Sequence, residues 1–228
     1  MKGSENYQVK VKNGAGWRAY DICRLQISVG QSYHEGEKLS ATLDWINDRF
    51  DKNIICVNDT LQRHNIEFQG HSSDEAFQLS QEAGREWIER NYKAITSLDN
   101  FEIIRWESWR QDPSYEYGLE VMNRLYRDKE SFRQEVNEEM YSFWERALKK
   151  DQTLDPSQFE KFKTHSLRYL LEECAVFQLM FAREEAVDIY PGSTLLPCKV
   201  AREKEKLGPK KGLGVRGYTR IDFRRKAA

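Results

Sequence analysis

The chain has 228 residues and a formal net charge of −1, with 39% hydrophobic and 32% charged residues. This length suits one domain with a substantial hydrophobic core and leaves little room for a second. No apolar run approaches the roughly 18–20 residues that a membrane span needs, and the first residues lack the apolar centre of a signal peptide, so we expect a soluble, cytoplasmic protein with no membrane partner.

The first predicted elements form a strand–helix–strand unit. Residues 21–29 make a short apolar run that ends at Gly30, which predicts a strand. The next apolar residues recur at i, i+4, i+7 and i+11 and predict one face of a helix; they are Leu39, Leu43, Ile46 and Phe50. A second buried strand is predicted over residues 53–58. Because a helical crossover joins parallel strands, this unit predicts a parallel sheet.

The second half of the chain continues the alternation of helices and strands. The predicted elements are a helix over residues 73–98, a strand over 101–106, one long or two consecutive helices over 115–150, a helix over 156–183 and a strand over 186–190. Ser72 or Ser73 is expected to cap the first of these helices, and Pro156 suits the first turn of the last one. The whole pattern predicts a single α/β domain with a mainly parallel sheet.

The charge is unevenly distributed between the body of the chain and its C-terminal end. Residues 199–228 contain 11 Lys and Arg against 3 Asp and Glu, whereas residues 1–198 contain 25 against 34. We therefore predict a domain over residues 1–198 and a basic tail over residues 199–228. The tail either adds an edge strand near residues 217–223 or is partly disordered, and its charge suits contact with a polyanion.

Ser28 lies at the end of the first predicted strand and is a candidate nucleophile. In open α/β sheets, ligands bind beyond the carboxyl ends of the strands, and Gly30 allows the backbone to approach a ligand closely. The chain has no Gly-x-Ser-x-Gly elbow and no His placed to activate Ser28. A lone Ser at a strand end is more often a turn or cap residue, so both interpretations remain open from these residues alone.

The helix over residues 156–183 carries a carboxylate on its core-facing stripe. The stripe residues recur at spacings of three and four and are Phe159, Phe162, Ser166, Tyr169, Glu173, Phe177 and Met180. An unpaired buried carboxylate is costly, so Glu173 is expected to meet a cation, a donor or a substrate amine; the alternative is an internal salt bridge. Glu172, one position earlier, is expected to be solvated.

Three separated motifs resemble the cyclodipeptide synthase family. They are Ile-Ser-x-Gly-x-Ser-Tyr at residues 27–33, Tyr-Leu-x-x-Glu ahead of an apolar residue and Phe at residues 169–177, and the tyrosine of Tyr190 and Pro191. The resemblance covers about residues 25–191. It implies one Rossmann-like domain similar to the catalytic domain of class I aminoacyl-tRNA synthetases. Gln31 and Pro191 resemble the Tyr-Pro-type subfamily, and Ala175 stands where the family usually has proline.

The resemblance also implies a reaction and a set of site residues. Two aminoacyl-tRNAs would be joined into a cyclic dipeptide without ATP, with Ser28 accepting the first aminoacyl group, Tyr169 and Glu173 holding its α-amino group, and Tyr190 relaying protons. An aminoacyl ester is already activated, so transfer to a serine needs no full Ser-His-Asp triad. The expected substrate-binding residues are Arg24, Gln26, Gly30, Gln31, Phe177 and Asp188.

Arg24, Gln26 and Asp188 raise the question of which amino acids are joined. They either contact a polar or charged substrate side chain, with Asp188 suiting a cation and Arg24 an acid, or Arg24 and Asp188 face solvent or pair with each other. The tRNA phosphates are expected on Arg85, Arg90 and Lys93. The positive charge of this helix face is reduced by three acidic residues, Glu82, Glu86 and Glu89. Other cations are therefore expected to share the binding of phosphates: Arg105, Arg110, Lys210, Lys211 and Arg216.

Two other functions compete with the acyltransferase. One is a non-catalytic tRNA-binding module of the same fold, which would form no covalent aminoacyl-enzyme. The other is a nucleotide-dependent ligase, which the lack of His-Ile-Gly-His, Lys-Met-Ser-Lys-Ser and Gly-x-x-x-x-Gly-Lys segments disfavours. The four cysteines lie far apart, with no Cys-x-x-Cys, so we expect no metal site. We also expect no cofactor, no DNA partner and a monomer.

Overall fold

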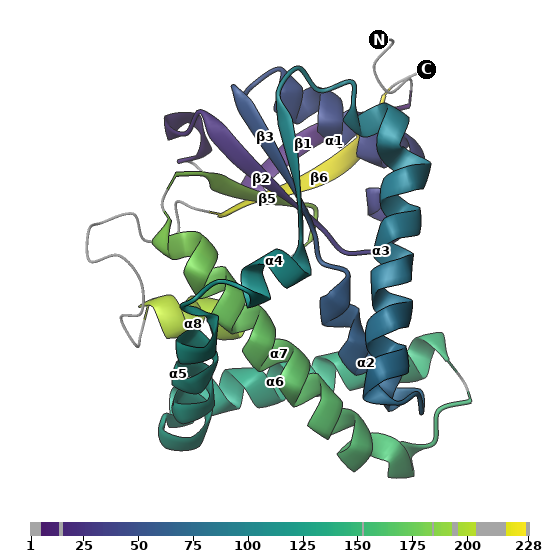
Figure 1. Ribbon diagram of the computed structural model, residues 1–228, viewed down its shortest axis with the longest axis vertical. Coiled ribbons are helices and arrows are strands. Elements are labelled where there is room, and N and C mark those ends of the chain that lie inside the picture. The colour runs from purple at the N-terminus through teal and green to yellow at the C-terminus, as the bar shows by residue number, and fades with distance from the viewer. Residues whose placement is uncertain are drawn as a thin grey trace.

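A six-stranded sheet organises the computed structural model, which describes residues 6–13, 16–151, 153–183, 185–192, 196–203 and 218–226 (Figure 1). The sheet order is β1-β6-β5-β2-β3-β4. The strands are β1 (Tyr7–Asn13), β2 (Ile22–Ile27), β3 (Lys52–Val57), β4 (Phe101–Arg105), β5 (Val187–Tyr190) and β6 (Tyr218–Arg225). Only β1 and β6 pair in antiparallel fashion; the other neighbours are parallel. The predicted mainly parallel α/β sheet is confirmed.

One face of the sheet is covered by two of the predicted helices. Leu25 and Ile27 of β2 and Ile55 of β3 pack there against α1 (Gly36–Asn47) and α3 (Ser73–Ile95). Strands buried on both faces are expected to be continuously apolar, and β2 and β3 are buried along almost their whole length. Ser72 caps α3 in a capping box with Glu75, as predicted.

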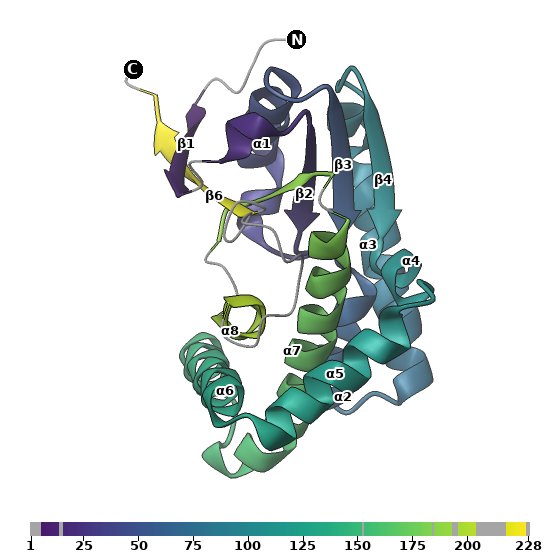
Figure 2. The same ribbon diagram turned by 90° about the vertical axis from the view of Figure 1, so that its left-hand side faces the viewer.

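The other face carries a helical layer built around α7 (Phe159–Ala182). Its other helices are α2 (Arg63–Phe68), α4 (Trp106–Arg110), α5 (Tyr115–Asp128), α6 (Glu130–Lys150) and α8 (Leu196–Glu203). Figures 1 and 2 show α5, α6 and α8 gathered around α7 beyond the carboxyl ends of the parallel strands. Residues 115–150 thus form two helices. Four short 3-10 helices complete the described elements: Trp17–Ala19, Ser32–His34, Thr60–Gln62 and Pro156–Gln158.

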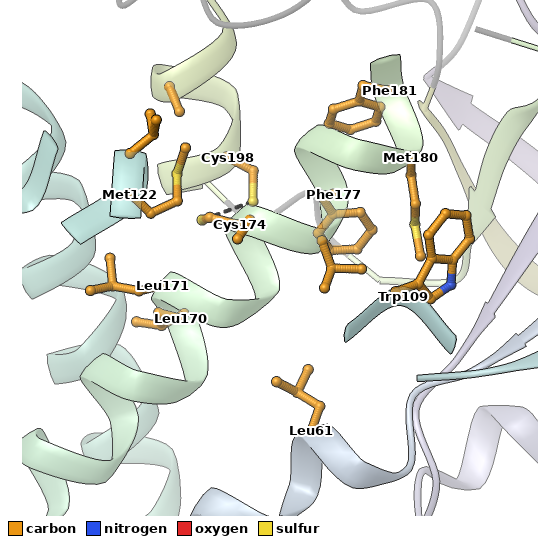
Figure 3. Packing of buried hydrophobic residues seen from close by; sticks show 14 of the residues in the cluster. Leu61, Trp109, Met122, Leu170, Leu171, Cys174, Phe177, Met180, Phe181 and Cys198 are labelled. Carbon is orange, nitrogen blue, oxygen red and sulfur yellow. Dashed lines mark hydrogen bonds between the residues drawn. The ribbon is translucent and has the colours of Figure 1, made fainter. Parts of the chain in front are cut away.

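Close packing fixes α7 within this layer. Leu171 and Cys174 point into the apolar cluster, and the Cys174 and Cys198 sulfurs lie 2.9 Å apart as free thiols (Figure 3). Ala175 continues the helix where proline was expected from the resemblance. A Cβ built on Gly118 of α5 would lie 3.8 Å from Ala175, which is ordinary van der Waals contact. The helix therefore presents one unbroken face over 24 residues.

Several elements were not predicted, and one prediction about the tail is wrong. The sequence pattern indicated neither β1, α2, α4 nor α8. The strand expected in the tail is present as β6, but it lies between β1 and β5 rather than at the edge, because β1 pairs with its outer side. Lys210, Lys211 and Arg216 fall outside the described residues. Within the described part of the chain, no helix is long and apolar enough to cross a membrane.

Candidate active site

A cavity of about 420 Å³ opens at the carboxyl ends of β2 and β5, beside α7. The turn after β2, the end of β5, and α6 and α7 all contribute side chains to its wall. Residues that the sequence singled out and that line the cavity are Gln26, Ser28, Gln31, Tyr169, Glu173, Phe177 and Tyr190. The structure thus brings the three separated motifs together around one space. This position agrees with the general location of ligand sites in parallel α/β sheets.

Three hydroxyl groups form a continuous chain in this cavity. Ser28 Oγ lies 3.0 Å from Tyr190 Oη, and Tyr190 Oη lies 2.8 Å from Tyr33 Oη. The parallel pairing of β2 and β5, in which Leu25 lies beside Ile189, brings the carboxyl ends of both strands to the same edge of the sheet. Gly30, with φ of +86°, turns the chain back after Ser28, a conformation that favours glycine. No role was predicted for Tyr33, although it ends the motif that contains Ser28.

The two tyrosines of this hydroxyl chain, Tyr190 and Tyr33, stay protonated at neutral pH. Burial raises the pKa of Tyr190 and of Tyr33 above the ordinary phenol value. Each phenol can therefore accept one hydrogen bond while donating another, which suits proton transfer along the chain. His34 packs against both rings, and burial lowers its pKa to about 3, so its imidazole is neutral.

Glu173 projects into the cavity from α7 with a free carboxyl group. Among the described residues, no cation or hydrogen-bond donor contacts it. Burial raises its pKa to about 8, and the charges of Glu139 and Glu172 add to the effect. Tyr169, one helical turn earlier, accepts a hydrogen bond from Gln62 Nε2 at 3.3 Å. A cationic group that enters the cavity would find a hydrogen-bond acceptor at Glu173. The alternative prediction, an internal salt bridge of Glu173, is not seen in the described part of the chain.

Glu172 is buried, so the prediction that it is solvated is wrong. Its side chain is 4% exposed and lies between the side chains of Arg63, His64 and Trp106. Burial alone would raise its pKa, but hydrogen bonds from His64 and Arg63 outweigh burial and lower the pKa to about 2. These partners come from α2 and α4, neither of which was predicted, so the sequence offered no partner for this carboxylate.

Arg24 and Asp188 pair with each other beneath the cavity. Arg24 Nε lies 3.1 Å from Asp188 Oδ1, and both side chains are at most 1% exposed. Gln26 donates to the same carboxylate at 2.7 Å and is the one member of this cluster that lines the cavity. The pairing alternative is therefore the one observed, and Arg24 and Asp188 stand behind Gln26 rather than in the cavity wall. Gly30 shapes the turn without lining the cavity.

The candidate tRNA-binding cations lie on α3, away from the cavity wall. Arg85 pairs with Glu82, Arg90 lies 2.9 Å from Glu35, and Lys93 is exposed. Arg105 and Arg110 are also paired, with Asp59 and Glu107 respectively.

Arg146 of α6 lines the cavity itself, and its side chain is 58% exposed. Arg146 was not predicted as a site residue, because it lies in a charge-rich helix and no motif distinguishes it from the other charged residues there.

In the described part of the chain, no group of three His, Cys, Asp or Glu residues is placed to hold a metal ion. The cavity wall carries hydroxyl groups, several side-chain amides, the Glu139–Arg146 ion pair and the carboxyl group of Glu173. A serine hydroxyl with two tyrosines behind it can attack an activated ester, and a carboxyl close by can hold an amine.

The geometry has counterparts in known proteins. A cyclodipeptide synthase family model matches residues 19–182. A cyclodipeptide synthase structure from Fluoribacter dumoffii has 26% sequence identity to this chain and a TM-score of 0.86, and the match covers 96% of this chain and 99% of that one. Among curated protein sequences, none matches this chain.

Two more distant structures share the fold. A Mycobacterium tuberculosis protein, described as showing that cyclodipeptide synthetases are related to type I tRNA synthetases, has 15% identity and a TM-score of 0.67, over 99% of this chain and 96% of that one. A cyclodipeptide synthase from Candidatus Glomeribacter gigasporarum bound to Phe-tRNAPhe has 17% identity and a TM-score of 0.66, over 91% and 88%. The single α/β domain predicted from the sequence is the fold that both structures share with this chain.

Proposed function

Because this chain belongs to the cyclodipeptide synthase family, a family of enzymes, we propose that it joins the aminoacyl groups of two aminoacyl-tRNAs into a 2,5-diketopiperazine. The observation that carries the proposal is the Ser28–Tyr190–Tyr33 hydroxyl chain facing the free Glu173 carboxyl in one cavity. The relative with bound Phe-tRNAPhe shares the fold, which supports aminoacyl-tRNA as the substrate class.

The first step transfers an aminoacyl group to Ser28. Ser28 Oγ attacks the ester carbonyl carbon, the bond between that carbon and the ribose oxygen breaks, and the ribose oxygen leaves as a hydroxyl. The serine proton is taken up by the leaving oxygen, directly or through the neighbouring phenol of Tyr190. Since the ester is already activated, a strong base is not required at this point.

Glu173 and Tyr169 bind the α-amino group of the attached residue. The Glu173 carboxyl has a pKa of about 8 in the free enzyme, so an arriving ammonium group can be held as an ion pair or can pass its proton to the carboxylate. The second outcome generates a neutral amine, the form that attacks an ester. Tyr169, which Gln62 holds in place, adds a second polar contact in the same wall.

Two amine attacks complete the product. The amine of the Ser28-bound residue attacks the ester of the second aminoacyl-tRNA, which forms a peptide bond and releases that tRNA. The amine of the resulting dipeptidyl group then attacks the Ser28 ester, which closes the ring and returns the serine hydroxyl. Tyr190, whose hydroxyl group is hydrogen-bonded to Ser28 Oγ in the free enzyme, relays the proton from the amine to the serine oxygen.

Two finer assignments belong to the same proposal. Gln31 in the cavity wall and Pro191 after the relay tyrosine support the assignment of the chain to the Tyr-Pro-type subfamily. The exposed side of α3, with Arg85, Arg90 and Lys93, contacts tRNA phosphates, which provide affinity rather than choice of amino acid.

Expression of the chain in a bacterium, followed by mass spectrometry of the medium, tests the function. We expect a diketopiperazine that is missing from cells expressing Ser28→Ala at the same level. Equal amounts of every diketopiperazine in the two cultures would refute the proposed reaction.

A further inference from the structure

A buried ion pair lies behind the cavity face of α7. Glu172 Oε1 accepts from Arg63 Nη1 at 2.8 Å and from Trp106 Nε1 at 2.8 Å. Glu172 Oε2 accepts from Arg63 Nη2 and lies 3.1 Å from His64 Nε2. Arg110 Nε lies 3.8 Å from Oε1. The bidentate contact with Arg63 fixes both the position and the orientation of the carboxylate.

The same segment that supplies Arg63 also reaches the cavity. Gln62 precedes Arg63 in the chain and donates to Tyr169 Oη, while Asn65 donates to Gln62 Oε1 at 2.8 Å. This segment therefore contacts α7 at two adjacent places: Arg63 at the start of α2 joins the buried ion pair, and Gln62 at the end of the preceding 3-10 helix contacts Tyr169 in the cavity wall. Glu172 is also the residue directly before Glu173, so the helix turn that carries one side chain carries the other.

We infer, on the basis of the proposed function, that Arg63 and Glu172 are positioning residues that hold Gln62 against Tyr169 and orient the amine-binding face of α7. Neither lines the cavity, so neither contacts the substrate. The other printed contacts between α2 and α7 lie farther along both helices, where Glu67 pairs with His165 and Arg168 and where Phe68 packs against Phe162. The contacts of Arg63 and His64 with Glu172 are therefore the ones nearest to Gln62. A small displacement of a positioning group can cost about 100-fold in rate.

A purely structural role makes a different prediction. Removing one partner of a buried ion pair leaves an uncompensated charge and destabilises the fold, whereas replacing both partners with apolar residues often restores stability. If the pair served stability alone, a double variant would recover stability and activity together. If it positions the cavity wall, the double variant recovers stability while the rate of acyl transfer stays low.

The experiment compares Glu172→Gln, Arg63→Met and Arg63→Met/Glu172→Leu with the wild type. Glu160→Gln is the matched control, because Glu160 lies on the same helix and is exposed. We expect aminoacyl-enzyme to form at least about 10-fold more slowly in all three variants, with tRNA affinity unchanged. We expect the double variant to melt closer to the wild type than either single variant does, although Trp106 Nε1 loses its acceptor, and we expect the control to match the wild type throughout.

A second readout does not need activity. In protein labelled with 3-fluorotyrosine, the 19F signal of Tyr169, assigned with Tyr169→Phe, should shift or broaden in all three variants and stay unchanged in Glu160→Gln. Recovery of both the rate and the Tyr169 signal in the double variant would overturn the inference, as would an unchanged signal in Glu172→Gln. If the wild type forms no aminoacyl-enzyme, the proposed function fails, and the Tyr169 signal still decides whether the pair positions the cavity wall.

Discussion

Glu172 and Glu173 are neighbours on one helix, and substitution of each by Gln should change stability in opposite directions. The pKa of Glu173 rises to about 8 and that of Glu172 falls to about 2, against an ordinary value of 4.5. Since the pKa of Glu173 is raised, its contribution to stability is complete below pH 4.5 and is lost as the pH rises toward 8. Since that of Glu172 is lowered, its contribution is present above pH 4.5 and is lost as the pH falls toward 2.

The size of each effect follows from the two pKa values. At 1.36 kcal/mol for each pH unit, ionising Glu173 in the folded protein costs at most about 5 kcal/mol at pH 8, and charged Glu172 contributes at most about 3 kcal/mol. A neutral Gln at position 173 avoids the cost of ionisation. For a chain of this size, 1 kcal/mol corresponds to about 2–4 °C in Tm. The Tm advantage of Glu173→Gln should therefore grow by about 10 °C between pH 5 and pH 8.

Thermal unfolding followed by circular dichroism at pH 5, 6, 7 and 8 measures this directly. We expect Glu173→Gln to melt above the wild type at pH 8 and close to it at pH 5, while the same substitution removes acyl-transfer activity. Glu172→Gln should melt below the wild type at every one of these pH values. A Glu173→Gln advantage that is independent of pH, or two substitutions with the same sign at pH 8, would refute the assignment of the charge states.

Three further outcomes are expected. Tyr190→Phe should accumulate dipeptidyl-enzyme, because the proton relay to Ser28 is lost; intact-protein mass spectrometry that finds only free enzyme would remove this role. Asp188→Leu should lower the Tm by about 10 °C, because it leaves Arg24 buried and unpaired, and should leave the ratio of products unchanged; a shift toward apolar products would instead make Asp188 a substrate contact. Charge reversal at the α3 cations should flatten the dependence of tRNA affinity on salt, by about 0.9 in log–log slope for each lost phosphate contact; the cations are Arg85, Arg90 and Lys93.

The sequence predicted the parts of the fold that local patterns determine. The strand predicted over residues 21–29, the buried strand after it and the long helix with Tyr169 and Glu173 each follow from apolar spacing. The structure has them as β2, β3 and α7. Their convergence on one cavity follows from the parallel sheet, whose strand ends meet at one edge. The roles of the candidate catalytic residues were predicted from the resemblance to the family, and the structure brings these residues together around one cavity.

What the sequence could not provide are contacts between elements that no local pattern links. Glu172 and Glu173 are identical in type and adjacent, and only the positions of α2 and α4 decide that one is paired and the other is free. The six-residue α2 is too short for a periodic signal. Tyr33 likewise acquires its role only because β5 brings Tyr190 within 2.8 Å of it.

The central claim is that Ser28 carries the aminoacyl group, and mass spectrometry of the peptides from acid-quenched enzyme tests it most directly. The enzyme is mixed with a pool of tRNAs charged with all twenty amino acids, quenched in acid within seconds and then digested. We predict a mass increase of one aminoacyl residue on the peptide that contains Ser28, and no increase in Ser28→Ala, which keeps the cavity and the tRNA-binding surface. An aminoacyl adduct on any other residue, or equal labelling of the two proteins, would contradict the account.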